Sequence, residues 1–262
     1  HFVRRRQRQM CIRDRSKDII ILSRKIASLD VCSTLGFIAE MHNWCRPLID
    51  NSKDFIIKDG RHSVVEKTIF KKSLNAFVPN DCSLSTNEHL WLITGPNMAG
   101  KSTFLRQNAH IIILAQIGSY VPAKQAKIGI ASKLFSRIGA SDNISKGQST
   151  FMVEMLETSN IIKNADDKSF IILDEIGRGT STFDGLAIAW AIIEKVLRSN
   201  KSRTLFATHY HELTEIEKTN SKVRNVSCEI KEWNDEIIYS YKVVEGKSKG
   251  SLGIKVAELA GF

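Results

Sequence analysis

The sequence lacks an apolar run of about 18 uncharged residues, and it has no recognisable signal peptide, so a membrane location is not indicated. Its five cysteines are odd in number and widely spaced, and no two of them form a C-x-x-C pair. This pattern suggests neither a disulfide framework nor a zinc site. The reducing cytoplasm is therefore the simplest location, and a chain of 262 residues can bury a core without covalent staples.

The net charge of +10 is unevenly distributed. Residues 1–15 hold six arginines and one aspartate, whereas the other 247 residues hold 32 basic and 27 acidic side chains. Such a tail could be a nucleic-acid-binding arm. Because the composition changes abruptly after it, we interpret residues 1–15 as a non-native extension. The modest excess that remains is no evidence for direct DNA contact.

A phosphate-binding loop is the clearest motif, since residues 95–102 fit G-x-x-x-x-G-K-[ST] in full. An apolar strand precedes it and a helical pattern follows it. Glycines let the main chain approach a polyphosphate, the lysine adds a charge near the β- and γ-phosphates, and the serine hydroxyl can bind Mg²⁺. The predicted nucleotide-binding residues are Gly95, Pro96, Asn97, Met98, Ala99, Gly100, Lys101, Ser102 and Thr103.

Two carboxylates end a second buried strand, which residues 169–174 are predicted to form. Asp174 suits the metal side of the site, and Glu175 suits the residue that polarises the attacking water. Since neighbouring side chains on a strand face opposite ways, we expect the two to divide these roles. A third buried strand from Arg203 ends at Thr208 and His209, and this histidine is placed to contact the γ-phosphate.

Further elements are predicted from periodicity and turn residues. The pattern favours one helix from Ser16 to about Leu48 and another capped by Ser149, with Met152, Met155, Leu156, Ser159 and Ile162 on one face. Short strands are expected at 54–57 and 75–78, with turns at 59–60 and 79–81. A helix is expected over about 186–197 after a polar loop, and a hairpin over 225–244.

Four ordered motifs together resemble the ATPase domain of the MutS family of DNA mismatch-repair proteins. They are T-G-P-N-M-A-G-K-S-T at 94–103, S-T-F-M-V-E-M at 149–155, L-D-E-I-G-R-G-T-S-T at 173–182 and A-T-H-Y-H-E-L at 207–213. The likeness covers essentially everything from Ser16 onward, and it favours the mismatch-repair branch over the paralogous branch in recombination. The L-S-G-G-Q signature, which a different ABC-type ATPase in transport or on chromosomes would carry, is absent.

The resemblance implies an α/β fold, a P-loop NTPase of ABC-ATPase type. Its mostly parallel sheet would be flanked by helices, with a small antiparallel β element and an N-terminal helical remnant. ATP and Mg²⁺ would bind at a composite site in a homodimer. Lys101, Glu175 and His209 would be catalytic, Ser102 and Asp174 would bind the metal, and Phe77 would stack on adenine. Ser149 would reach the partner's nucleotide in trans.

The resemblance also sets expectations for the rest of the protein. Residues 16–48 would be the end of a lever helix and residues 49–262 the ATPase domain, without the C-terminal dimerisation helices. Mismatched double-stranded DNA would bind domains that have no counterpart here, and a MutL-like repair factor would act downstream in a bacterial cytoplasm. An alternative is a nucleotide-gated dimerisation module with negligible turnover of its own.

Overall fold

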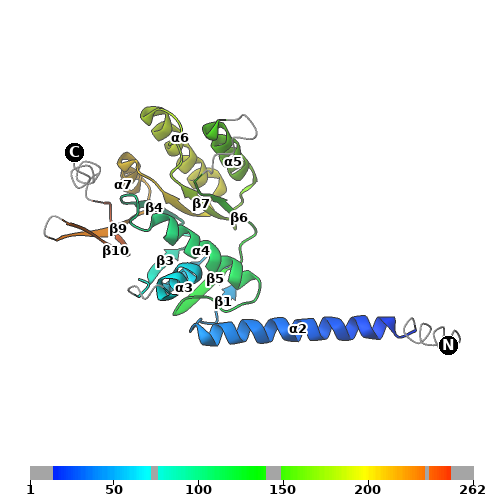
Figure 1. Cartoon of the computed structure of the whole chain (residues 1–262). Helices are drawn as coiled ribbons and strands as arrows, with labels where there is room; N and C mark the ends of the chain where they lie inside the picture. The colour runs from blue at the N-terminus through cyan, green and yellow to red at the C-terminus, as the bar shows by residue number, and fades with distance from the viewer. Residues whose placement is uncertain (1–13, 72–75, 140–148, 234–235, 249–262) are drawn as a thin grey trace. The chain divides into compact units, whose positions relative to one another are not determined.

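The computed structural model describes residues 14–71, 76–139, 149–233 and 236–248 (Figure 1). The chain forms two compact units, residues 1–44 and 45–262. The predicted extension at 1–15 lies almost entirely outside the described residues, and so does everything after residue 248. Within the described ranges, no helix is long and apolar enough to cross a membrane.

The first unit contains one long helix, α2, which spans Ser16–Met41. The predicted end near Leu48 was wrong. Asn43 takes a left-handed conformation, with φ of 51°, and its N–H bonds the Glu40 carbonyl while the Trp44 N–H bonds the Ala39 carbonyl. This hydrogen-bond pair is a Schellman motif, which closes the helix well before Pro47. Within α2 only Ala39 is buried, so its apolar residues have no core of their own.

The second unit is built on a six-stranded sheet in the order β10-β9-β4-β8-β7-β6. All neighbouring strands in it run parallel except the hairpin of β9 and β10. This confirms the predicted mostly parallel sheet and the predicted C-terminal hairpin. The strands are β4 (Leu90–Thr94), β6 (Leu134–Arg137), β7 (Phe170–Asp174), β8 (Arg203–Ala207), β9 (Val223–Trp233) and β10 (Glu236–Glu245).

A second sheet has four strands in the order β1-β5-β2-β3. It is the predicted small β element, and its pairs are antiparallel except that of β1 with β5. The strands are β1 (Leu48–Asp50), β2 (Phe55–Gly60), β3 (Asn80–Leu84) and β5 (Gln125–Gly129). Helix α3 (Ser63–Lys71), between β2 and β3, was not predicted.

The predicted strand at 75–78 and both predicted turns were misplaced. Residues 76–79 form no strand, residue 75 lies outside the described part, and pairing with β2 begins at Asn80, inside the predicted turn. Asp59 and Gly60 belong to β2, where the register shifts and Asp59 adopts a φ of 48°. The bend therefore lies within a strand as a bulge rather than in a loop.

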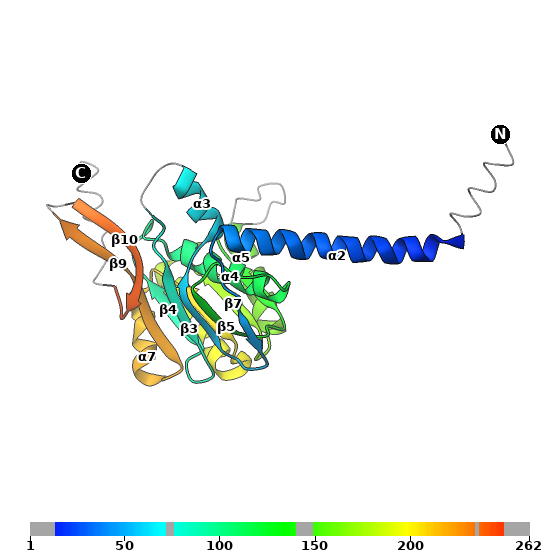
Figure 2. The ribbon, with the colours of Figure 1, turned by 90° about the horizontal axis from the view of Figure 1, so that it is seen from below.

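Helices cover both faces of the six-stranded sheet (Figures 1 and 2). On β4, Trp91 and Ile93 join a core shared with α4 (Lys101–Gln116) and the second sheet. Leu90 and Leu92 face the opposite core, with α5 and α6. That side holds α5 (Thr150–Asn164), α6 (Thr182–Lys195), a π-helical turn (Val196–Asn200), a 3₁₀ turn (His211–Glu215) and α7 (Ile216–Thr219).

Two helix predictions need correction. Helix α6 begins at Thr182, four residues before its predicted start, because the Ser181 hydroxyl accepts the Asp184 N–H as an N-cap. On α5 the buried residues are Glu154, Thr158 and Ile161, whereas two residues of the predicted apolar face, Met152 and Leu156, are half exposed. The hydrophobic effect therefore does not explain the burial of Glu154 and Thr158 on α5.

Candidate active site

The phosphate-binding loop lies between the end of β4 and the start of α4. Gly95 and Gly100 have φ of 135° and 101°, conformations that L side chains rarely adopt. Gly100 is the N-cap of α4 and supplies no side-chain acceptor to the first N–H groups of the helix. These N–H groups and the helix dipole form a site for an anion.

Lys101 lies over this loop with only 4% of its side chain exposed. Its ammonium donates to the Gly95 carbonyl at 2.6 Å and to the Pro96 carbonyl at 3.0 Å, and it lies 3.5 Å from a Glu175 carboxylate oxygen. The lysine thus holds a nearly buried positive charge against backbone carbonyls. Phosphate oxygens are stronger acceptors for the same ammonium.

Asp174, the last residue of β7, is 8% exposed. Burial raises the pKa of its carboxyl group and adjacent Glu175 adds to the rise, while a hydrogen bond from Ser102 opposes it. Its Oδ1 atom is buried and has no hydrogen-bond partner among the described residues. A buried, unpartnered carboxylate oxygen beside a serine hydroxyl suits a hard cation such as Mg²⁺.

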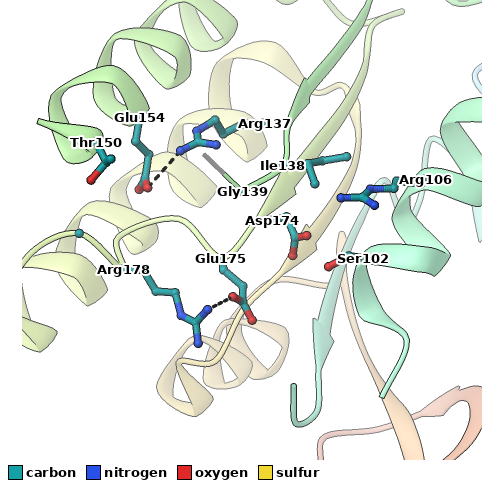
Figure 3. A pocket seen from close by; sticks show the side chains of 11 residues that line it. Ser102, Arg106, Arg137, Ile138, Gly139, Thr150, Glu154, Asp174, Glu175 and Arg178 are labelled. Atoms are coloured by element: carbon teal, nitrogen blue, oxygen red, sulfur yellow. Dashed lines mark hydrogen bonds and ion pairs between the residues drawn. The ribbon is translucent and has the colours of Figure 1, made fainter. Parts of the chain in front are cut away.

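Glu175 follows β7 in a left-handed conformation, with φ of 55°. Its carboxylate pairs with the Arg178 guanidinium at 2.5 Å. The Asn97 amide, oriented to satisfy both neighbours, donates to Glu175 at 3.2 Å and accepts from Arg178 at 3.1 Å. Because Glu175 lies beyond the strand, strand alternation does not govern it, and both carboxylates line one pocket (Figure 3). The expected opposite orientation was therefore wrong.

A pocket of about 330 Å³ lies over the loop and includes Lys101, Ser102 and Thr103. Three residues lining it, Met98, Glu175 and Tyr241, are non-glycine residues with positive φ. The described part of the chain has only three others. Such conformations cost about 1–3 kcal/mol each and persist where surrounding structure imposes them, often at functional sites.

A larger and more apolar pocket of about 510 Å³ adjoins the first and shares Gly100, Thr103 and Tyr241 with it. Phe77, the predicted aromatic base partner, lines it, and so does Tyr241, which sequence reasoning missed. Asn80 fixes Tyr241 in place, since its amide donates to the Tyr241 carbonyl at 2.9 Å and accepts the Val243 N–H at 2.8 Å. Two aromatic residues thus border one apolar pocket beside the phosphate loop.

His209 lies just beyond β8, at the sheet edge where β4 and β7 also end. Its side chain is exposed, and its ring centroid lies 4.1 Å from that of Tyr210. Partial desolvation lowers the pKa of His209, and the nearby positive charge of Arg178 lowers it further, so the ring is neutral at pH 7. A neutral imidazole here can donate one N–H to an anion without adding charge.

Ser149 is not brought together with the loop of its own chain. It is the N-cap of α5, accepts the Met152 N–H at 3.1 Å and is exposed. It lines neither of the two adjoining pockets described above. Its hydroxyl hydrogen remains available to an acceptor outside its own loop.

Several lining residues of the site were not singled out from the sequence, among them Arg178 and Tyr241. Arg178 lies in the glycine-rich loop after β7, and its i+3 spacing from Glu175 could have indicated an ion pair. Tyr241 has no such signal, because the bulge that orients it depends on Asn80, which lies 161 residues away in sequence. Tertiary hydrogen bonds of this kind leave no local pattern.

The parallel sheet, with the phosphate loop and the Asp174–Glu175 pair at its carboxyl edge, defines a P-loop NTPase of ABC-ATPase type. The family model described as MutS domain V matches residues 91–262. The DNA mismatch repair protein MutS of Ruegeria pomeroyi is 53% identical over 244 residues, which cover 92% of this chain and 28% of that protein.

Other relatives bear the same description. MutS of Ehrlichia chaffeensis is 50% identical over 252 residues, covering 96% of this chain and 31% of that protein. MutS of Thermodesulfovibrio yellowstonii is 53% identical over 240 residues, covering 90% of this chain and 28% of that protein. The chain belongs to the MutS family, and it spans less than a third of the length of these relatives.

Proposed function

We propose that the chain binds ATP and hydrolyses it in a Mg²⁺-dependent reaction. The observation that carries this proposal is the position of the buried, unpartnered Asp174 oxygen beside Ser102, at the first turn of a helix whose N-terminus has no side-chain cap. Phosphate oxygens would satisfy the loop N–H groups and Lys101. Ser102 and Asp174 would hold Mg²⁺, which supplies positive charge against the phosphates.

Glu175 is the proposed general base. Its carboxylate lies in the pocket over the loop, where it can accept a proton from the attacking water. In the structure it is paired with Arg178 and lies near Lys101, so these cations must turn toward phosphate before it acts. His209 is proposed to donate to the γ-phosphate. The adenine base is proposed to enter the larger pocket, against Phe77 and Tyr241.

The exposed position of Ser149 supports a composite site, in which its hydroxyl completes the nucleotide site of a second copy in a homodimer. Within residues 16–48, helix α2 (Ser16–Met41) is proposed as the end of a lever helix, and residues 49–262 are proposed as the ATPase domain. In the longer protein, nucleotide state would control a DNA clamp. Mismatched DNA would bind other domains, a MutL-like factor would act downstream, and the compartment would be a bacterial cytoplasm.

A second candidate is a nucleotide-gated dimerisation module that turns over ATP negligibly on its own. The pairing of Glu175 with Arg178 favours it, because at 2.5 Å the guanidinium occupies an oxygen of the carboxylate that would accept the proton of the attacking water. In this reading, hydrolysis begins only when a partner reorganises the site.

One set of measurements separates the two functions. Glu175→Ala should retain ATP binding in calorimetry and lose hydrolysis by about 10²- to 10⁴-fold, because it removes the base and leaves the loop intact. Unchanged turnover in this variant would exclude Glu175 as the base. Light scattering of Glu175→Ala with and without Mg-ATP should show a shift from monomer to dimer. A chain that dimerises with Mg-ATP but has no measurable turnover without substitution supports the module instead.

A further inference from the structure

Glu154 is a buried carboxylate in the middle of the domain, on helix α5, and is 7% exposed. Its Oε1 atom accepts the backbone N–H of Gly177 at 2.6 Å. Leaving a charged group this deeply buried is costly unless it is paired and hydrogen-bonded. The interaction therefore fixes the relative position of α5 and the loop after β7.

Gly177 is held from both sides. Its N–H binds Glu154, and its carbonyl accepts the Tyr210 hydroxyl at 3.0 Å. Its φ is 91°, and a Cβ atom there would lie 2.7 Å from the Gly185 carbonyl oxygen. This peptide therefore has little room to shift.

Gly177 lies within the loop that determines the state of the proposed base. Glu175 is two residues before it and Arg178, the ion-pair partner of Glu175, is the next residue. With φ of 55° at Glu175 and 91° at Gly177, a small rotation of this loop would re-aim both charged side chains. The Gly177 peptide thus sets where the carboxylate and the guanidinium point.

The charges around Glu154 keep the arrangement in place. The Arg137 guanidinium lies 3.5 Å from Glu154 (Figure 3). The Nε atom of Arg137 lies 3.0 Å from Glu157. Burial, and the negative charge of Glu154 after it, raise the pKa of Tyr210, so the phenol stays protonated and remains a donor. Arg137 and Tyr210 therefore support the same loop from two directions.

The other end of this connection is the N-terminus of α5. Glu154 lies five residues after Ser149, about one and a half turns along a continuous helix. A displacement of Ser149 is therefore transmitted along α5 to Glu154. We propose that Glu154 is a positioning residue that couples the α5 N-terminus to the loop of Glu175 and Arg178, so that engagement of Ser149 by a partner's nucleotide adjusts the hydrolysis site of its own chain.

This inference rests on the proposed ATPase function and deepens it. It requires that removal of the Glu154 carboxylate impair turnover and communication but spare nucleotide binding, because Glu154 does not line the pocket over the phosphate loop. It lines the pocket that holds Asp174 and Glu175 instead. Misplacement of a reacting group by about 1 Å costs about 10²-fold in rate. Glu154→Ala should therefore lower kcat by about 10- to 100-fold and change the KM for ATP by less than about threefold.

The experiment uses the whole chain and two readouts. Steady-state hydrolysis gives kcat and KM, and hydrogen exchange is followed over residues 149–155 and 176–178 with Mg²⁺ and a non-hydrolysable ATP analogue. In the unsubstituted chain the analogue should slow exchange in both segments. In Glu154→Ala it should bind with similar affinity, exchange at 176–178 should be faster, and the response of 149–155 should be lost.

Matched variants separate positioning from simple destabilisation. Glu157→Ala removes the other carboxylate that pairs with Arg137, on the same helix but without contact to Gly177, and should leave kcat and both exchange responses unchanged. Glu154→Gln keeps an acceptor oxygen and should retain kcat within about threefold. Should Glu154→Ala fail to fold, Tyr210→Phe removes the opposite hydrogen bond and should lower kcat alone by about 3- to 10-fold.

The outcomes are distinguishable. Retention of kcat and of the 149–155 response in Glu154→Ala, or of kcat in Tyr210→Phe where Glu154→Ala does not fold, overturns the coupling. Absence of analogue binding by the unsubstituted chain overturns the proposed function and the coupling together. Binding by the unsubstituted chain without any response at 149–155 overturns the coupling alone.

Discussion

Helices α4 and α5 each begin at a small residue, Gly100 and Ser149, yet the two N-termini have opposite surroundings. The start of α4 is uncapped, and Lys101 and Asp174, both buried, surround it. The start of α5 is capped by its own serine and exposed. The first is an anion site built from one chain, whereas the second offers a hydroxyl with no phosphate loop of its own beside it.

The two helices also differ in how they are held. Nine residues of α4 are buried, most of them apolar, whereas α5 buries three, of which two are polar. Hydrophobic packing therefore fixes α4, and specific hydrogen bonds such as that of Glu154 fix α5. A helix that must respond to a partner benefits from the second arrangement, because a few polar contacts can be exchanged without disrupting a core.

Truncation of a leucine to alanine should lower the free energy of unfolding much more in α4 than in α5. Leu105 on α4 is fully buried and Leu156 on α5 is 50% exposed. Leu105→Ala should lower the free energy of unfolding by about 2–5 kcal/mol through lost burial and a cavity. Leu156→Ala should cost about 0.5 kcal/mol. Urea unfolding of both variants measures the two values, and equal losses would contradict the comparison.

The free energy of unfolding should also depend on pH, through His62, which lies close to α4. Burial lowers the pKa of His62 to about 4, and the charges of His110 and Arg106 add to this. The unfolded histidine binds its proton near pH 6.5, so the stabilisation is present above that value and is lost as pH falls toward 4, by up to about 3 kcal/mol. Urea midpoints between pH 7 and 4 test this.

His62→Gln is the control for that pH dependence. It should reduce the dependence of stability on pH without abolishing it, since burial also lowers the pKa of His89. An unchanged slope in His62→Gln would show that His62 titrates normally in the folded chain.

The two N-termini should differ in their effect on nucleotide affinity. Lys101→Ala removes a charged donor from the loop and should weaken ATP binding by about 1.5–3 kcal/mol, which is roughly 10- to 100-fold in Kd. Ser149→Ala in a dilute, monomeric sample should leave Kd unchanged. Titration calorimetry measures both, and a weaker Kd in monomeric Ser149→Ala would place this serine in its own chain's site.

The smallest expected effect is the capping contribution of Ser149 itself. Ser149→Ala loses the hydrogen bond to the Met152 N–H and should lower stability by about 0.5–2 kcal/mol, whereas Ser149→Gly should cost only a few tenths. Both variants should lose dimer formation with Mg-ATP in light scattering. Loss of the dimer in Ser149→Ala alone would trace it to helix fraying rather than to the missing hydroxyl.

The sequence allowed much of this architecture to be predicted where signals were local. The strand, loop and helix at 90–116, the strand ending at Asp174 and the cap at Ser149 follow from apolar runs, glycines and a hydroxyl at fixed spacing. The end of α2 was mispredicted because Pro47 is a strong helix-stop signal, whereas the actual stop is Asn43, which adopts the left-handed conformation of a Schellman motif.

The missed parts of the site depend on contacts between distant segments. Glu154 lies between apolar residues on α5, and its burial is explained by its hydrogen bond to Gly177 and its ion pair with Arg137. Tyr241 depends on Asn80 across the two sheets. Periodicity predicts that the apolar face of a helix is the buried one. A buried polar contact can place a polar residue in the interior instead.

The order of the six-stranded sheet has a consequence for synthesis of the chain. Strand β4, which ends at the phosphate loop, pairs only with β8 and β9, and Leu90 meets Thr204 and Val223. At about 5–20 residues per second, a ribosome adds the intervening stretch of about 110 residues in roughly 6–22 s. Throughout that interval the apolar segment of β4 has neither neighbour, and the nascent chain must keep it from pairing with another nascent chain.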